Sequence, residues 1–494
     1  MSSFLDERFY PRYAKIGTFA VSHAPYNAQF PGLYDKFRAY HESFKKKLSA
    51  CGVEVVDLGI IDSEEDAFAA ARRLAGESPD LIFCNMITYA TSSVFAPFLT
   101  ELKTPVVLAA LQPLAALDYT KANTRMQLEN DNICAVPEFT GVAKRLGRRV
   151  EDCILGTLEG DAAADAAIAE WCDIAKVLNA LRGARIGLLG HTMEAMYDMH
   201  ADPTAITRTF GVHVPLLEID DILRCKHEVT EEEIKLAISR IDEVFDTPEP
   251  SSDAIAEKLT DRDKTVAAVY AAALERLVRE KHLRGLAYYY EGTEGAENRE
   301  AASSLIVGNS FLNARGVPMC GEYDIKTCIA MLIMDTLGIG GSFAELHPFD
   351  FAEDCILVGH DGPHHIAIAE GRPALRSLKK YHGKPGSGAS VEFKLREGEI
   401  TLFGIGQDAA GNFRFIVGEG TSEHGPIPPT GNTNTRARFL PSTKEFVRRW
   451  VMAGPTHHFA LGLGHRAATI EKIASVLGVS CVNVSQIKNL RFTI

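Results

Sequence analysis

Short apolar segments alternate with longer amphipathic segments from residue 15 onward, and this alternation constrains the fold more than any other feature. Four runs have the length and composition of buried strands, and helical stretches separate them: residues 15–22, 53–59, 80–87 and 105–111. Apolar strands that alternate with amphipathic helices are typical of a parallel sheet with helices on both faces. We therefore predict an N-terminal α/β domain over residues 1–180.

A second unit of the same kind begins near Ala184. Its expected strands are residues 184–190, 212–219, 285–292 and 317–322, with long helical segments between them. We predict a second parallel-sheet domain over residues 181–340. Open α/β sheets tend to place ligand chemistry at the carboxyl ends of their strands, so the end of segment 317–322 is a candidate site.

The periodicity changes after residue 340. SVEFKLREGEITLFGIG (390–406) alternates apolar and polar residues and is broken at Glu397-Gly398, while DAAGN (408–412) forms a second turn. Period-two alternation with turns predicts antiparallel hairpins. The expected fold class is therefore α/β: two Rossmann-like parallel-sheet domains, then a β-rich, barrel-like C-terminal domain over 341–494 that includes a helix at 442–452.

Composition argues against several classes of partner. The 494-residue chain carries a net charge of -13, and an acidic surface repels phosphate backbones. No apolar run approaches the roughly 20 residues of a membrane helix, and the N-terminus has no apolar signal segment. The ten cysteines show no C-x-x-C spacing. We expect a cytoplasmic protein with reduced thiols and neither nucleic-acid nor membrane partners.

Four places along the chain carry residues suited to metal chemistry. They are Glu322 in CGEYDIKT, Glu345 in GGSFAEL, His360 in ILVGHDG and the pair His457-His458 in AGPTHHF. A mixed set of carboxylates and imidazoles suits Mn²⁺, Fe²⁺, Co²⁺ or Zn²⁺. Each residue alone can be accounted for without a metal, because glutamates often cap helices and histidines at strand ends are often only hydrogen-bonded.

Together these segments resemble the L-arabinose isomerase family and, more distantly, L-fucose isomerase. Those enzymes carry a GE-x-D-x-KT segment, a GG-(T)SF-x-E segment, a histidine after a short apolar strand, and a late HH pair. All four occur here in the same order and with similar spacing. The layout of two α/β units and a β-rich domain also matches along nearly the whole chain.

The resemblance implies a site and an activity. Glu322, Glu345, His360 and His458 would bind one divalent metal, typically Mn²⁺, and the two glutamates would also act as the acid–base pair. His457 would support the site or the substrate. The implied enzyme is an aldose–ketose isomerase that acts on a monosaccharide through an enediolate. Family members form homotrimers or homohexamers in which the N-terminal unit of one subunit caps a neighbour's site.

The segments that would contact the sugar depart from the arabinose isomerase pattern. VSHAPYN, with His23, replaces a Gln-His-Leu-Tyr-Gly run, and Tyr89 stands where the family has phenylalanine. Glu291 matches the acid of a Phe-Glu-Asp run, and Leu346-His347 replace Asp-Tyr. We therefore expect a substrate other than L-arabinose, with His23, Tyr89 and Glu291 as pocket candidates. Packing at a loop tip is the alternative for each.

Other assignments stay open. A non-catalytic sugar-binding protein could clasp a sugar between two α/β lobes, and a metal-dependent sugar epimerase could use the same enediolate with a different reprotonation site. His364-His365 is a second candidate metal pair, but we expect it to lie along a strand with one ring facing in and one out.

Overall fold

The chain forms two compact units. The computed structural model describes residues 3–249, 256–289, 296–362, 364–381, 384–428 and 432–486. The N-terminal unit is Arg12–Asn179, and the C-terminal unit combines Met1–Pro11 with Ala180–Ile494. The division into three domains stays a prediction.

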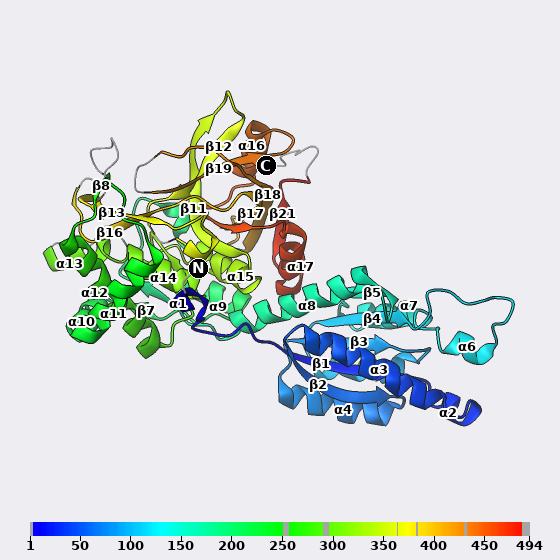
Figure 1. The fold of residues 1–494 in the computed structure, drawn as a ribbon. Helices are drawn as coiled ribbons and strands as arrows, with labels where there is room; N and C mark the ends of the chain where they lie inside the picture. The colour runs from blue at the N-terminus through cyan, green and yellow to red at the C-terminus, as the bar shows by residue number, and fades with distance from the viewer. Residues whose placement is uncertain are drawn as a thin grey trace. The chain divides into compact units, whose positions relative to one another are not determined.

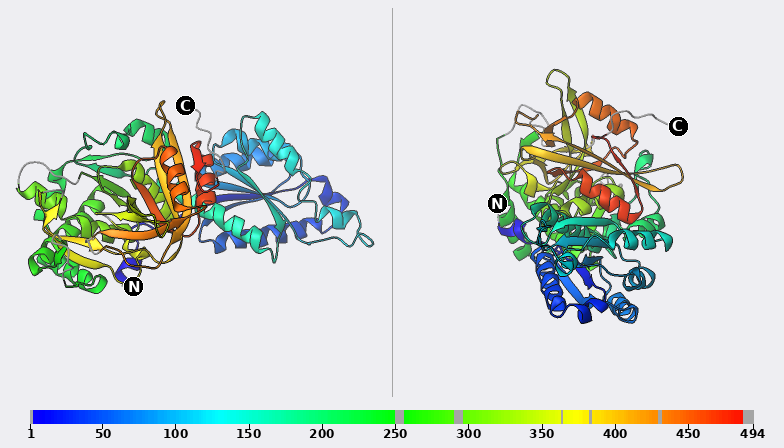
Figure 2. Two further views of the ribbon diagram at one scale, coloured as in Figure 1. Left: turned by 90° about the horizontal axis from the view of Figure 1, so that it is seen from above. Right: turned by 90° about the vertical axis from the view of Figure 1, so that its right-hand side faces the viewer.

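The N-terminal unit is built on a five-stranded parallel sheet with the order β2-β1-β3-β4-β5. Helices lie on both faces of this sheet (Figures 1 and 2), which explains why its central strands are buried along almost their whole length. The strands are β1 Lys15–Val21, β2 Glu54–Ile61, β3 Leu81–Met86, β4 Val106–Gln112 and β5 Asp152–Thr157.

Helix α4 shows why the predicted helices form. Ser63 caps it by accepting a hydrogen bond from the Asp66 amide (3.1 Å), and its buried residues recur at helical spacing as Ala67, Ala71 and Leu74. A β-carbon at Gly17 would lie 2.7 Å from Leu74, so only glycine allows the helix this close to β1. The helices of this unit are α2 Pro25–Gln29, α3 Leu33–Ala50, α4 Glu64–Glu77, η1 Ser92–Val94, α5 Ala96–Glu101, α6 Thr124–Leu128, α7 Val136–Arg145 and α8 Ala162–Leu181.

The C-terminal unit contains a four-stranded sheet with the order β10-β9-β6-β7, parallel throughout. Its strands are shorter than expected, and the segment 212–219 contributes only Leu216–Leu217. The elements are β6 Ile186–Leu189, β7 Leu216–Leu217, β9 Gly285–Tyr288 and β10 Met319–Cys320, with α1 Ser3–Asp6, η2 Tyr197–Met199, α9 Pro203–Phe210, α10 Ile219–His227, α11 Glu231–Val244, α12 Asp261–Lys281, α13 Ala296–Ser303, α14 Ile306–Ala314 and α15 Ile325–Thr336.

A closed antiparallel barrel forms the rest of this unit. Six strands follow the order β17-β20-β11-β12-β19-β18, and pairing of β17 with β18 closes the ring, while β21 adds to β18 in parallel. The predicted fold class, including its barrel-like C-terminal part, is confirmed. The elements are β11 Gly340–Asp350, β12 Cys355–His360, β17 Gly398–Gln407, β18 Phe413–Ser422, β19 Thr433–Phe439, β20 Phe459–Leu463 and β21 Ser480–Asn483, with α16 Thr443–Met452 and α17 Ala467–Leu477.

One of the two expected hairpins is correct. Strands β17 and β18 pair across the turn at 408–412, as predicted. The hairpin expected around Glu397-Gly398 is wrong, because the chain passes there from one sheet to another instead of folding back. Strand β16 (Ala389–Glu392) pairs with β13 (Ala374–Leu378), which also pairs with β8 (Ala256–Lys258). Near these strands lie η3 Ile366–Ile368, β14 Lys380–Tyr381 and β15 Lys384–Pro385.

Helix α15 joins the parallel sheet to the barrel. All of its residues are buried, and it contacts β9 and β10 on one side and β11, β17 and β20 on the other. A helix that is apolar on every face must be enclosed by protein, which accounts for this central position. Its first turn therefore lies where the two layers meet.

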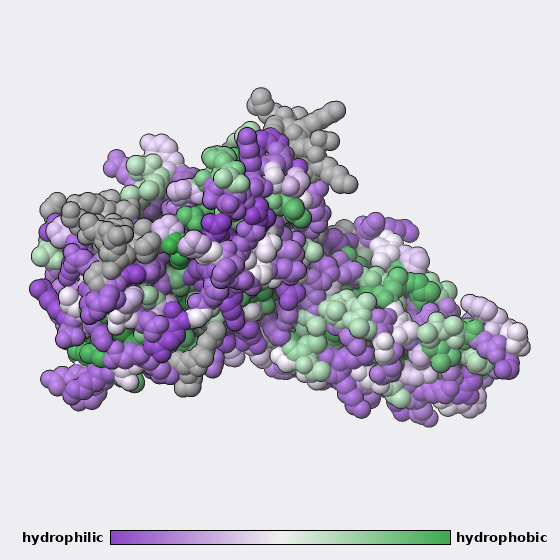
Figure 3. Space-filling view, turned by 45° about the horizontal axis from the view of Figure 1, so that its top comes forward, coloured by the Kyte–Doolittle hydropathy of each residue, from purple (hydrophilic) through white to green (hydrophobic). Residues whose placement is uncertain are grey.

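Charged residues make up 24% of the chain. On the face drawn in Figure 3, hydrophilic residues predominate and apolar residues form scattered groups. Scattered apolar residues are normal on a protein surface and mark no site by themselves. Among the described residues, no helix is both long enough and apolar enough to cross a membrane.

The N-terminal segment is tied to α15 by a buried carboxylate. Asp335 is 2% exposed; it pairs with Arg8, whose Nη1 lies 3.2 Å from Oδ1, and with His365, whose Nε2 lies 3.4 Å away. Burial raises the pKa of Asp335, but His365 and Arg8 outweigh it and lower that pKa from 3.8 to about 2. This carboxylate therefore stabilises the fold above pH 3.8, and the contribution is lost as the pH falls toward 2.

We expect Asp335→Asn to lower the free energy of unfolding by about 3 kcal/mol at pH 7, because it breaks a buried charge pair. The difference in the free energy of unfolding between the variant and wild type becomes smaller as the pH falls below 4. Urea titrations at several pH values measure this difference. Asp220→Asn, at an exposed position, is the control and changes stability by less than about 0.5 kcal/mol. A pH-independent difference would contradict the assignment.

Candidate metal centre

A strained turn presents Glu322. Strand β10 ends at Cys320, and Glu322 and Tyr323 both adopt left-handed backbone angles, with φ of 57° and 62°. Such a conformation costs a non-glycine residue on the order of 1–3 kcal/mol, so the surroundings must hold it. The Tyr323 amide donates to the Tyr288 carbonyl (2.9 Å), which ties the turn to β9.

Asp324 ends the turn and begins α15. Its carboxylate caps the helix by accepting hydrogen bonds from the amides of Lys326 and Thr327, each at 3.1 Å. Because α15 is enclosed by the sheet and the barrel, this cap fixes the direction in which the turn enters the helix. The side chain of Glu322 is therefore placed by buried structure, not by a free loop.

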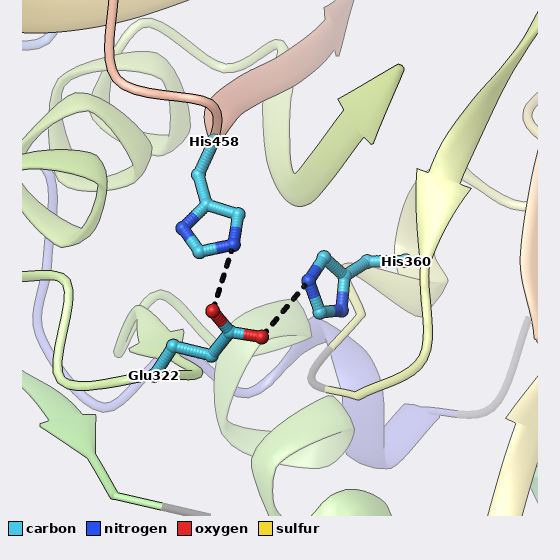
Figure 4. Close-up of side chains that lie close together, drawn as sticks. All are labelled: Glu322, His360 and His458. Atoms are coloured by element: carbon cyan, nitrogen blue, oxygen red, sulfur yellow. Dashed lines mark ion pairs between the residues drawn. The ribbon is translucent and has the colours of Figure 1, made fainter. Parts of the chain in front are cut away.

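Three side chains from distant parts of the chain converge at this turn (Figure 4). His360 is the last residue of β12, and its Nε2 lies 3.7 Å from Glu322 Oε1. His458 directly precedes β20, and its Nε2 lies 3.3 Å from Glu322 Oε2. One ligand atom from each lies within 4.8 Å of the other two, so a single ion could contact all three.

Glu345 and His457 lie beside this group. Glu345 Oε1 is 4.0 Å from His360 Nε2, and His457 Nε2 is 3.6 Å from Glu322 Oε2. Glu345, His457 and His458 form a second set whose ligand atoms lie within 4.8 Å of one another. The structure thus brings together all five of the residues expected from the four motifs.

Phe343 packs the two imidazoles in place. Its ring centroid lies 4.3 Å from that of His360 and 4.4 Å from that of His458. A β-carbon at Gly321 would lie 3.0 Å from the Phe343 ring, so a larger residue there would push the ring aside. The glycine of the GE-x-D-x-KT segment therefore has a packing role.

The polar atoms of this group fit a divalent cation. Within the described part of the chain, Glu322 Oε2 and His458 Nε2 are buried and make no hydrogen bond of acceptable geometry, although they lie 3.3 Å from each other. Buried polar atoms without a partner are rare in folded proteins, and a bound ion can satisfy them. Carboxylate oxygen with imidazole nitrogen is a donor set that Mn²⁺, Fe²⁺, Co²⁺ and Zn²⁺ accept.

Two carboxylates orient the imidazoles, and the sequence motifs did not predict this role for either. Asp324 Oδ2 lies 3.1 Å from His458 Nδ1, and Asp361 Oδ1 lies 3.2 Å from His360 Nδ1. In metal sites such partners fix the ring and leave the other nitrogen free for the ion. Asp324 is the aspartate of GE-x-D-x-KT and Asp361 follows His360, so the local sequence did contain a signal.

The charges in the group support one another. Burial raises the pKa of Glu322, but His457, His458 and His360 outweigh it and hold that pKa well below its usual range. Burial lowers the pKa of His457, but Asp198 and Glu322 outweigh it and raise that pKa to about 10. The arrangement thus keeps Glu322 ionised, as a cation ligand must be.

A cavity of about 300 Å³ opens beside Glu345 and His457. Its volume is at the lower end of the roughly 300–1,000 Å³ of small-molecule sites. Two further polar residues lie close by: Asp198 lines the cavity, and His347 Nε2 is 4.0 Å from Glu345 Oε1. The remaining lining residues are Leu346, Trp450, Val451, Pro455 and Thr456.

Two of the three pocket candidates belong to the N-terminal unit and the third is not described. His23 and Tyr89 belong to the N-terminal unit, where they follow β1 and β3 and their rings meet edge to face at 5.8 Å. Glu291 lies outside the described residues. Their role in a sugar pocket stays a prediction.

The prediction that His364-His365 lie along a strand, with one ring facing in and one out, is wrong. The pair precedes the 3₁₀ turn η3 and lies on no strand, and both side chains are buried. Burial lowers the pKa of His364 to about 3, while His365 pairs with Asp335. Neither ring belongs to a candidate metal group among the described residues.

Comparison with known proteins shows which enzymes the chain resembles. Residues 340–480 match the family described as L-arabinose isomerase C-terminal domain. An L-arabinose isomerase of Nocardioides sp. is 25% identical over 415 residues, covering 82% of this chain and 80% of that protein. The chain is thus similar to L-arabinose isomerases over most of its length, and residues 340–480 match the C-terminal domain of that family.

More distant relatives agree with this placement. An L-arabinose isomerase of Anoxybacillus flavithermus is 22% identical and covers 81% of this chain and 79% of its own length. A sulfoquinovose isomerase of Alkalicoccus urumqiensis is 23% identical, covering 62% of this chain and 66% of that protein. The relatives that this chain resembles are therefore named for two different sugars.

We expect His360→Ala to weaken Mn²⁺ binding at least about 10-fold, because it removes one of three converging donors. Isothermal titration calorimetry on metal-stripped protein measures the affinity. His227→Ala, an exposed histidine on α10, is the control and leaves the affinity unchanged. Equal Mn²⁺ affinity in His360→Ala and wild type would remove His360 from the site.

Asp324→Asn tests the orienting carboxylate. Asparagine caps a helix as well as aspartate does, so α15 keeps its N-cap while the partner of His458 loses its charge. We expect Mn²⁺ affinity to fall about 10- to 100-fold. Thermal melts without metal show whether the fold is preserved, and an unchanged affinity in a stable variant would contradict the role.

Proposed function

We propose that this chain is a metal-dependent aldose–ketose isomerase that acts on a monosaccharide other than L-arabinose. The observation that carries the proposal is the convergence of Glu322, His360 and His458, with Glu345 beside them lining a cavity. Similarity to the relatives described above supports the reaction class, since they are named as isomerases.

Glu322, Glu345, His360 and His458 would hold the cation. When bound, a divalent cation would stabilise the negative charge that develops on the oxygens of the open-chain sugar. The remaining chemistry is the transfer of hydrogen from one sugar carbon to its neighbour. A carboxylate within reach of the carbon-bound proton can remove it, and the resulting enediolate is reprotonated at the adjacent carbon.

The surroundings of the two glutamates suggest different tasks. The side chain of Glu322 is 8% exposed and is surrounded by three imidazoles, which keep it ionised. It is therefore suited to bind the cation. The side chain of Glu345 is 31% exposed and lines the cavity. We therefore assign proton transfer at carbon mainly to Glu345, and ligation together with transfer of the hydroxyl proton to Glu322.

One departure from the family pattern, Leu346-His347, lies on the cavity side of the site. Leu346 lines the cavity and His347 faces Glu345, where other members have Asp-Tyr. A change of residue type here alters the groups that a sugar would meet, while the cation ligands stay the same. This supports a substrate other than L-arabinose. By the same resemblance we propose a homotrimer or homohexamer with shared sites.

Glutamine substitutions test the two glutamates. We expect Glu322→Gln and Glu345→Gln each to lower kcat/KM at least about 100-fold, because an amide cannot accept the substrate proton. A screen of neutral and acidic aldoses and ketoses with Mn²⁺ identifies the substrate for these measurements. Glu353→Gln, at an exposed turn, is the control and keeps wild-type activity.

Three outcomes would contradict the proposal. Wild-type turnover after EDTA treatment and gel filtration would exclude metal dependence. Products formed in deuterated water separate the alternatives, because an isomerase yields the ketose whereas an epimerase returns an aldose with inverted configuration. Binding of a sugar with no product at all would favour the non-catalytic sugar-binding protein.

A further inference from the structure

The side chain of Asp198 contacts both the backbone and the ring of His457. The His457 amide donates to Asp198 Oδ2 (3.0 Å), and the same oxygen lies 2.7 Å from His457 Nδ1. The two residues are 259 positions apart in the chain. An ionised carboxylate can only accept hydrogen bonds, so Nδ1 must be the donor.

This contact determines which ring nitrogen faces the site. With Nδ1 engaged by Asp198, the other nitrogen, Nε2, lies 3.6 Å from Glu322 Oε2. His457 and Asp198 both line the cavity beside Glu345. Without the carboxylate, the half-exposed ring could rotate about its side-chain bonds, and the donor that it presents to a substrate would change.

Lys326 holds Asp198 in turn. The Lys326 side chain is buried, and its ammonium group donates to the backbone carbonyl of Asp198 and to that of His200 (3.4 Å). A buried ammonium needs such acceptors, because desolvation otherwise destabilises the charge. Lys326 lies in the first turn of α15, directly after the turn that presents Glu322.

We propose that Asp198 is a positioning residue for the reaction: it fixes the backbone and ring of His457 so that Nε2 faces the bound sugar. The 3₁₀ turn η2 that carries Asp198 is anchored by Lys326 of the GE-x-D-x-KT segment. The same first turn of α15 therefore orders both the cation ligand Glu322 and the residue that orients His457. The activity readouts of this inference rest on the proposed isomerase function.

Asp198→Ala is the main test. We expect kcat/KM to fall about 10- to 100-fold, the range seen when an orienting partner of a functional histidine is removed. Mn²⁺ affinity by calorimetry stays within about twofold of wild type, since Asp198 contacts neither Glu322, His360 nor His458. Glu194→Ala, an exposed acidic residue of the same loop, is the control and keeps wild-type kcat/KM.

Two further variants separate positioning from general damage. Asp198→Asn keeps an oxygen that can accept both hydrogen bonds, so it restores most of the activity lost in Asp198→Ala. In the His457→Ala background, Asp198→Ala has no additional effect, because the ring that it orients is gone. Additive losses in the double variant, or a drop in Mn²⁺ affinity as large as that in kcat/KM, would overturn the proposal.

A chemical readout tests the contact without any turnover. The rate at which diethyl pyrocarbonate modifies His457, followed by peptide mass spectrometry, rises in Asp198→Ala and not in Glu194→Ala. Lys326→Met produces a similar rise, because it releases η2. An unchanged modification rate in Asp198→Ala would overturn the positioning role even if no sugar is converted, whereas absent turnover with a raised rate would overturn only the isomerase assignment.

Discussion

The site depends on the interaction of the buried Glu322 carboxylate with the imidazoles around it. A carboxylate charge removed from water is costly unless positive charge or hydrogen-bond donors surround it. Here three imidazoles surround it, and each is held from behind by an aspartate: Asp361 for His360, Asp324 for His458 and Asp198 for His457. Carboxylates and imidazoles thus alternate outward from the centre.

The helix α15 explains how this charge arrangement is built into the fold. Its buried, apolar body fills the space between the parallel sheet and the barrel, while its first turn carries Asp324 and Lys326. Asp324 caps the helix and orients His458, and Lys326 anchors the η2 turn. A single buried helix end therefore fixes elements that come from three separate parts of the chain.

Periodicity was enough to predict the parallel sheets and the barrel, because buried strands and amphipathic helices leave strong local patterns. The convergence of the candidate cation ligands could be anticipated because their motifs are local and occur in a recognisable order. Asp198 could not be predicted, because its loop has no periodic pattern and its partner lies 259 residues away. The prediction of a hairpin at Glu397-Gly398 was wrong because strand pairing is also not visible in the local sequence. A polar turn does not show whether the chain folds back or passes to another sheet.

The closed barrel also has a consequence for how a metal would be exchanged. Glu345 lies on β11, which is flanked by β12, ending at His360, and by β20, preceded by His458. Neighbouring strands are about 4.8 Å apart, and a closed ring of hydrogen bonds leaves them little freedom to slide. The candidate donors therefore hold their spacing as part of the sheet itself, and a bound ion would be able to leave and be replaced by another without the backbone having to refold around it.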